Sequence, residues 1–131
     1  MMQRIILTLM VILLIAATQA ASKPPDVEAE TEEVLNLLLP ASTMTIPPQS
    51  SCQGLYRYQQ GKPKVKDLLA MELAGFSGGK NTIVGSCKGE PKSCVLRIRH
   101  AYGEDVYSAD IRFSVHEGAV DISTLSCIMT P

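Results

Sequence analysis

The sequence predicts an α+β domain in which one or two helices pack on an antiparallel meander of about four to five strands. Two segments before residue 77 carry apolar residues at helical spacing, and from Asn81 onward the apolar period changes to two. The chain also holds four cysteines behind an apparent export signal, which is typical of two disulfides. Together these features predict a small, disulfide-stapled domain.

Residues 1–20 have the pattern of a secretory signal peptide. Arg4 is the only charge before Lys23, Ile5 to Ala17 are mostly apolar, and Thr18 and Ala20 place small residues before a cleavage site. The apolar run is shorter than the roughly 20 residues that a membrane span needs. We therefore expect a periplasmic or secreted protein with no stable membrane insertion after cleavage.

Length and charge restrict the remaining chain further. Removing residues 1–20 leaves 111 residues, which suits one domain. Without Arg4 the chain holds 11 basic and 13 acidic residues, a net charge of −2. This balance gives no basic footprint for nucleic acid, so no nucleic-acid partner is expected.

Residues 21–51 are predicted to form an acidic helix and a connector. Five acidic residues lie between Asp26 and Glu33, where they complement the positive end of a helix dipole. The helix is expected from about Val27 to Leu39, because Asp26 is a good cap and Pro40 stops the segment. Residues 41–51 are rich in Pro, Ser and Thr and indicate an extended connector. Whether the helix packs on residues 52–131 stays open.

Residues 52–131 are predicted to form the stapled α+β domain. The aromatic run Leu55–Tyr58 fits a strand between two glycines. After Pro63, apolar residues from Val65 to Phe76 recur at helical spacing and predict a second helix that ends near Gly75.

Period-two alternation then predicts the strands of the sheet. A change of parity in the last run predicts a bulge around Ser123 and Thr124. Ile83 and Val84 lead to Cys87 in the first run. Each of the next two runs has one apolar face, made of Leu96, Ile98, His100 and Tyr102 in one and of Tyr107, Ala109, Ile111, Phe113 and Val115 in the other. In the last run, Val120 and Ile122 stand on one parity and Leu125, Cys127 and Met129 on the other.

The cysteines allow three pairings, of which we favour Cys87 with Cys94 and Cys52 with Cys127. Cys87 and Cys94 stand at the root of one hairpin, where opposite positions approach within disulfide reach. The other bond would tie the first strand to the last. Zinc is the alternative, but no two cysteines have the short spacing of zinc ligands, so no metal or other cofactor is expected.

Several fragments imitate catalytic motifs without completing one. Ser77-Gly-Gly-Lys80 matches Ser-x-x-Lys, but the companion motifs are missing and the two glycines favour a loop. His100 is expected on an apolar strand face as a hydrogen-bonded residue, and His116 in a turn. We therefore do not expect an enzyme.

The loop between Cys87 and Cys94 is the candidate partner-binding feature. It presents Lys88, Gly89, Glu90, Pro91 and Lys92 on a covalently closed hairpin. A disulfide that restricts a loop before a partner arrives lowers the entropic cost of binding. The alternative is that Lys88 and Lys92 are solvated residues at a hairpin tip.

This segment resembles the protruding loop of the Ivy-type periplasmic lysozyme inhibitors. The similarity covers Ile83 to Lys88, then Pro91, Cys94 and Leu96 to Ile98, about 16 of 131 residues. The resemblance implies an α+β protein that inserts the loop into a hydrolase's catalytic cleft. Only Lys88 and Pro91 match positions of the family's loop, which here is two residues longer and lacks its histidine.

The expected function is that of an exported protein-binding module. Its sharpest form is an inhibitor or immunity protein that neutralises a peptidoglycan hydrolase or another toxin in the periplasm. The alternative is an accessory protein of an envelope assembly or secretion machine that docks through its N-terminal helix.

Overall fold

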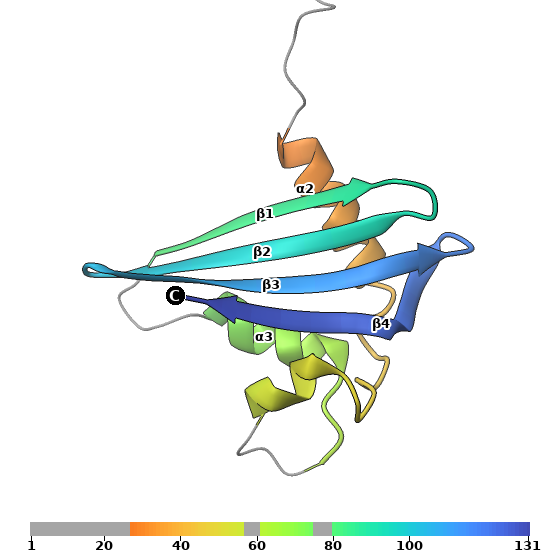
Figure 1. Cartoon of the computed structure of the whole chain (residues 1–131), viewed down its shortest axis with the longest axis horizontal. Coiled ribbons are helices and arrows are strands. Elements are labelled where there is room, and N and C mark those ends of the chain that lie inside the picture. The colour runs from red at the N-terminus through yellow and green to blue at the C-terminus, as the bar shows by residue number, and fades with distance from the viewer. Residues whose placement is uncertain (1–26, 57–60, 75–79) are drawn as a thin grey trace, which may run out of the picture.

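A computed structural model describes residues 27–56, 61–74 and 80–131 of the chain (Figure 1). The predicted signal peptide and its cleavage site lie outside these residues, as does the cap at Asp26. Two α-helices and a four-stranded antiparallel sheet form the described structure, which confirms the α+β class. No helix among the described residues is both long and apolar enough to span a bilayer.

The sheet is a meander whose spatial order follows the chain, β1-β2-β3-β4. Its strands are β1 (Lys80–Lys88), β2 (Ser93–Tyr102), β3 (Asp105–His116) and β4 (Ala119–Thr130). The register places Gly85 opposite Leu96, and Leu96 opposite Ile111, so that the predicted apolar positions share one face. This inner face holds the core, including the fully buried Leu96, Ile98 and Ile111.

Helix α2 (Val27–Leu38) confirms the first predicted helix and packs on the inner face against β1. Val34 and Leu38 are fully buried in the common core, and so is Ile46 of the segment that follows. The question that the sequence left open is therefore answered: the acidic helix is part of the packed structure.

Helix α3 (Val65–Ala74) confirms the second predicted helix. It lies on the same side of the sheet as α2 (Figure 1) and buries Val65 and Leu68. Asp67, in its first turn, accepts the N–H of Lys64 on Oδ2 at 2.8 Å and so fixes the residue that precedes the helix. The expected continuation to Phe76 lies outside the described residues.

The prediction of a strand at Leu55–Tyr58 is wrong at Leu55 and Tyr56, since Ser51–Tyr56 form the 3₁₀ helix η1. The rest of that range lies outside the described residues. The segment satisfies the edge of β4 through side chains instead of a strand ladder. Ser50 Oγ donates to the Leu125 carbonyl at 2.6 Å, and Ser51 Oγ accepts the N–H of Cys127 at 2.8 Å. No further strand beside β4 is therefore needed to pair these edge groups.

Both predicted disulfides are present, Cys87–Cys94 and Cys52–Cys127. The second bond ties η1, rather than a first strand, to β4. The predicted bulge is also present: Arg112 pairs with Ser126 and Ser114 with Asp121, so four residues of β4 lie opposite Phe113 alone.

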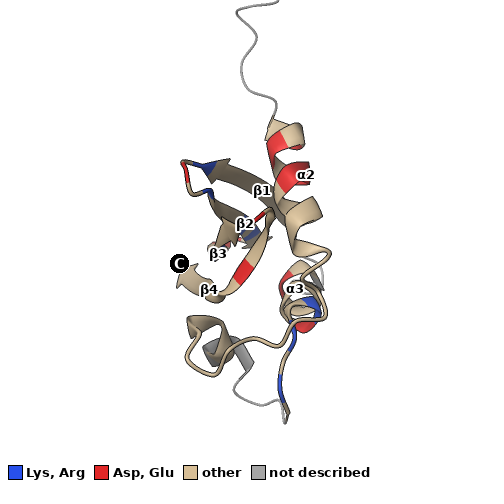
Figure 2. Cartoon of the chain, turned by 90° about the vertical axis from the view of Figure 1, so that its right-hand side faces the viewer, with Lys and Arg blue, Asp and Glu red and all other residues tan. Residues whose placement is uncertain are grey.

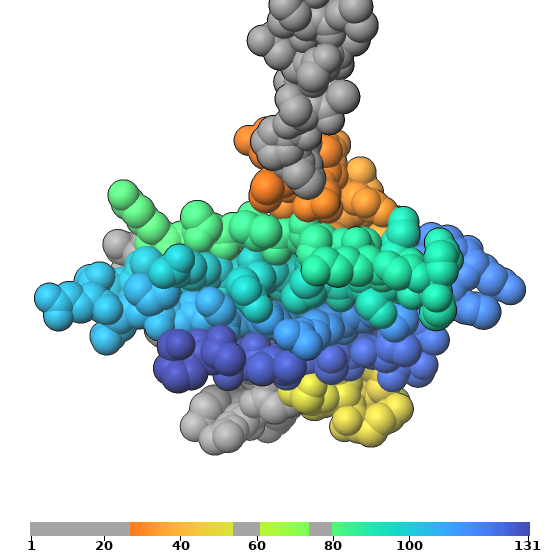
Figure 3. Space-filling view, turned by 45° about the horizontal axis from the view of Figure 1, so that its top comes forward, coloured from red at the N-terminus to blue at the C-terminus, as the bar shows by residue number. Residues whose placement is uncertain are grey.

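The helices cover one side of the sheet only. Viewed along the sheet, α2 and α3 lie together on one side of it (Figure 2). The opposite side, which we call the outer face, forms a continuous exposed surface made by all four strands (Figure 3).

Candidate functional site

The predicted binding loop is held rigidly at its base. Cys87 lies directly opposite Cys94, and the next pair, Lys88 and Ser93, continues the β1–β2 ladder. Gly89 has a φ of +83°, a left-handed conformation that glycine adopts without the strain of a side chain. Lys88, Gly89, Glu90 and Pro91 are all exposed. The structure thus places four of the five predicted contact residues on a fixed, accessible tip.

Lys92 differs from the other loop residues because it is attached to the rest of the fold. Its Nζ lies 2.6 Å from Glu33 Oε1 of α2, and its carbonyl accepts the N–H of Val115 at 2.8 Å. The Glu33 carboxylate, through its hydrogen bond and charge, raises the pKa of Lys92. Lys92 therefore anchors the loop to α2, a role that the sequence did not indicate.

The outer face beside the loop is basic. By the strand register, the basic side chains on this face outnumber the carboxylates of Asp110 and Asp121. These basic residues are Lys80, Lys88, Arg97, Arg99 and Arg112. The exposed acidic residues Glu28, Glu32 and Glu33 lie on α2, on the other side of the sheet. The two sides of the molecule thus differ in charge.

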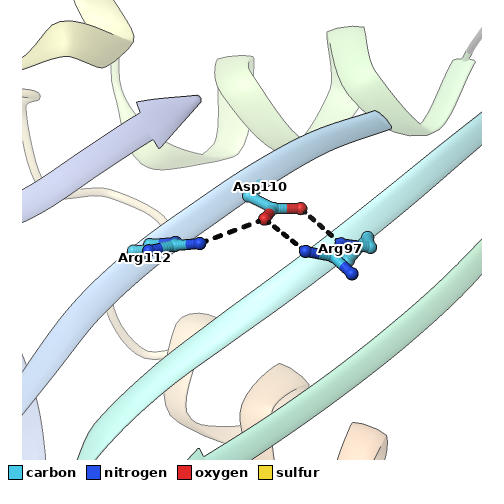
Figure 4. Close-up of polar contacts among 3 residues, drawn as sticks. All are labelled: Arg97, Asp110 and Arg112. Atoms are coloured by element: carbon cyan, nitrogen blue, oxygen red, sulfur yellow. Dashed lines mark hydrogen bonds and ion pairs between the residues drawn. The ribbon is translucent and has the colours of Figure 1, made fainter. Parts of the chain in front are cut away.

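Asp110 organises two of these arginines (Figure 4). Arg97 lies opposite it on β2 and donates from Nε and Nη2 to its two carboxylate oxygens, each at 2.8 Å. Arg112 approaches the same carboxylate with Nη2 at 3.4 Å. The Asp110 side chain is only 6% exposed, whereas the two arginines are more than half exposed. Hydrogen bonds from Arg97, followed by the charges of both arginines, lower the pKa of Asp110 despite its burial.

Next to this cluster, the outer face contains a hollow of about 460 Å³, which we call the outer hollow. Small side chains of β1 and β2 form much of its lining, and the bulged part of β4 forms one side. Lys88 and Arg112 supply its two charged groups. Its lining side chains include Ser86, Lys88, Ser93, Val95, Arg112, Ser114, Thr124 and Ser126.

The hydroxyl groups of the outer hollow differ in availability. Thr124 Oγ1 donates to the Asp121 carbonyl and accepts the N–H of Ser114, so it fixes the bulge. Among the described residues, no hydrogen bond uses the hydroxyls of Ser86, Ser93 or Ser126, and Lys88 makes no ion pair. These groups are available to a ligand.

His100 lies in a separate, buried polar cluster on the inner face. Its Nδ1 lies 2.8 Å from Asn81 Oδ1, and its Nε2 lies 3.2 Å from Glu72 Oε2. Asn81 Nδ2 donates to the Leu73 carbonyl, which orients Asn81 Oδ1 to accept from His100. His100 and Glu72 are both almost fully buried, so the cluster joins α3 to the sheet. Burial and the nearby Glu72 charge also raise the pKa of Tyr107, whose ring packs on His100.

The other residues that resembled parts of catalytic motifs do not lie together in the described structure. Ser77 lies outside the described residues, Lys80 is exposed at the start of β1, and His116 is exposed at the end of β3. Within residues 27–56, 61–74 and 80–131, no three His, Cys, Asp or Glu side chains gather as a metal site.

Both sheet edges carry caps from outside the strands. At β1, the Gly85 N–H donates to Thr31 Oγ1 of α2 at 3.0 Å. At β4, the hydroxyls of Ser50 and Ser51 form hydrogen bonds with backbone groups of the strand. Side chains that satisfy edge groups hinder the addition of another strand at these positions. The loop and the outer face are therefore the better surfaces for a partner.

Sequence reasoning missed the outer-face residues Arg97, Asp110 and Arg112. Their signal was nevertheless present, because each stands between buried apolar residues in a strand of period two. Comparisons of the chain with models of known families, with curated proteins and with solved structures find no match. Its function is therefore inferred from the residues themselves.

Proposed function

We propose that this protein is an exported binding module that inhibits or neutralises a cell-wall-degrading enzyme or toxin, and that the loop Lys88–Lys92 makes the central contact. The two disulfides suit an oxidising compartment, which agrees with the predicted export to the periplasm or the medium.

The observation that carries the proposal is the way the loop is fixed. A disulfide closes its base, the Lys92 to Glu33 ion pair holds one side, and Lys88 to Pro91 project into solvent. A loop of this kind loses little conformational entropy on binding, which is how rigid inhibitor loops gain affinity. Its exposed lysine is suited to a cleft lined by carboxylates, as in the catalytic sites of many glycoside hydrolases.

The experiment is a capture and inhibition assay. The full chain is expressed, and the exported protein is offered to a panel of peptidoglycan hydrolases and periplasm-acting toxins. A retained hydrolase should lose activity on cell walls in proportion to bound inhibitor. Lys88→Glu should weaken binding by at least roughly tenfold, because it places like charges together. Lys62→Glu, which changes an exposed lysine away from the loop, is the matched control.

The proposal would fail if Lys88→Glu and Pro91→Ala left every such complex unchanged. It would equally fail if Lys62→Glu weakened binding as much, since the effect would then be general charge attraction.

A second candidate function is docking on an envelope machine through α2. It is favoured by a shallow hollow of about 400 Å³ along this helix, lined by Ala29, Glu32, Glu33, Asn36 and Leu37. Because Val34 and Leu38 are core residues, deleting the helix would unfold the protein. Glu32→Lys is the sharper test: it should abolish docking on a machine subunit but leave hydrolase inhibition intact. Glu104→Lys, in the exposed β2–β3 turn, is its control.

A further inference from the structure

We propose that the outer hollow binds a carboxylate-bearing segment of the partner protein, held between Lys88 and Arg112. This inference rests on the proposed function, and it adds a second contact region beside the loop together with the chemistry of the surface that it recognises.

The shape of the outer hollow follows from its residue types. Ser86, Val95, Arg112 and Ser126 form one row across the four strands. Three of these side chains are short, so they leave space that Arg112 borders from β3. The next row runs from Lys88 through Ser93 and Ser114 to Asp121, which does not line the hollow, and the Ser114 N–H donates to Thr124 Oγ1. The result is an open depression with a cation from each of two rows.

The charges of the outer hollow are not neutralised within the described structure. Lys88 has no ion-pair partner there, and Arg112 shares Asp110 with Arg97, which takes both carboxylate oxygens at 2.8 Å. The contact from Arg112 is longer, at 3.4 Å, and uses only one of its nitrogens. Because a guanidinium has five N–H donors, most donors of Arg112 remain available.

Asp110 also orients the arginines. Its carboxylate is buried at the base of the cluster, with both guanidinium groups lying beside it (Figure 4). An arginine held by a neighbouring carboxylate loses less side-chain entropy when it binds a second one. Asp110 is therefore a positioning residue for Arg112.

The lining favours carboxylates of a protein over a sugar chain. The free hydroxyls of Ser86, Ser93 and Ser126 can donate to carboxylate oxygens, and Lys88 and Arg112 supply complementary charge. Among the described residues that line the hollow, the only aromatic one is Phe113, a residue that is 2% exposed and packs in the core. No exposed ring is thus available for the stacking that sugar rings prefer. The hollow also adjoins the loop through Lys88, so one partner can contact both.

A titration with a defined acidic peptide tests this inference. The exported protein, labelled with nitrogen-15, is titrated at low ionic strength with an end-blocked pentaglutamate, and amide shifts are followed by NMR. We expect saturable shifts at Ser86, Val95, Ser114 and Ser126. Lys88→Met and Arg112→Met should each lower the affinity for the peptide by roughly tenfold. Lys62→Met and Lys66→Met remove exposed charges outside the hollow and should leave the affinity unchanged.

Three results would overturn the inference. The first is that an end-blocked pentaglutamine binds as tightly as pentaglutamate, and the second is that the control variants lower the affinity as much as Lys88→Met and Arg112→Met do. The third is that inorganic phosphate shifts the same amides with the same midpoint, which would assign the hollow to a small anion. Spectra of the free variants show whether each is folded, and Arg112→Lys should retain part of the affinity.

The test also separates this inference from the proposed function. If the protein inhibits a hydrolase but does not respond to the peptide, the inference about the outer hollow is wrong and the proposed function stands. If the protein responds to the peptide but retains no hydrolase or toxin, the outer hollow is supported as a carboxylate site. The proposed inhibitor function is then contradicted.

Discussion

Val34 of α2 occupies the space that a side chain at Gly85 of β1 would need. A Cβ at position 85 would lie 2.9 Å from Val34 Cβ and 3.2 Å from the Thr31 backbone. Gly85→Ala should therefore push α2 away from the sheet and destabilise the protein by about 1–3 kcal/mol. Denaturant unfolding measures this change. Ser86→Ala, one residue along on the outer face, is the control, and an equally stable Gly85→Ala protein would contradict the close packing.

Thr31 should stabilise the same contact through its hydroxyl. Its Oγ1 accepts the buried Gly85 N–H at 3.0 Å and donates to the Val27 carbonyl at 2.7 Å. Thr31→Val keeps the shape but leaves that N–H without an acceptor, at a cost of about 1 kcal/mol or more. Hydrogen exchange at the Gly85 amide should become faster. Thr31→Ser should behave like the native protein; if Thr31→Val exchanges no faster, the hydroxyl does not protect the edge.

The two disulfides should contribute unequally to stability. Cys52–Cys127 closes a sequence separation of 75 residues and Cys87–Cys94 one of 7. In the chain-entropy description, these loops correspond to about 4.5 and about 2.5 kcal/mol respectively. Thermal unfolding of the two paired Cys→Ala variants compares them. A larger loss from the Cys87 and Cys94 pair would show that loop-closure entropy does not govern their contributions.

Asp110 should make stability depend on pH in the acid range. Its arginine partners lower its pKa in the folded state, so the folded protein binds fewer protons than the unfolded chain there. The stabilisation is present above the unfolded pKa of about 3.9 and is lost as the pH falls through the folded pKa. At neutral pH, Asp110→Asn should cost about 1 kcal/mol, because both arginines are more than half exposed and water screens the pairs.

The check is the difference in melting temperature between the native protein and Asp110→Asn. This difference should be constant above about pH 5 and shrink as the pH falls further. Asp105→Asn, in the exposed start of the same strand, is the matched control. A difference that grows as the pH falls would have the wrong sign for this cluster.

Local patterns in the sequence were sufficient for most of the secondary structure. Period-two runs identified which residues of β2 and β3 face the core, and the change of parity before Leu125 located the bulge. The hairpin root identified the Cys87–Cys94 pair, which left Cys52 for Cys127. The expected strand was wrong at Leu55 and Tyr56, the part of Leu55–Tyr58 that the structure describes, because aromatic content alone cannot say whether a sheet edge will accept a strand there.

The candidate site was predicted only in part. The sequence indicated the loop Lys88–Lys92 because both cysteines stand beside it. It did not indicate that Lys92 binds Glu33, 59 residues earlier, or that Lys88 and Arg112 border one hollow.

The α+β class, the two helices, the strand faces and the closed loop could be predicted from local sequence patterns, because each depends on neighbouring residues and on the helical or strand period. Three relationships depend on the folded structure: α2 seals the β1 edge, η1 takes the place of the expected strand, and Asp110 brings Arg97 and Arg112 together on the outer face. These relationships join residues far apart in the chain, and they depend on strand register and on how closely the helices pack. No local period encodes either of these.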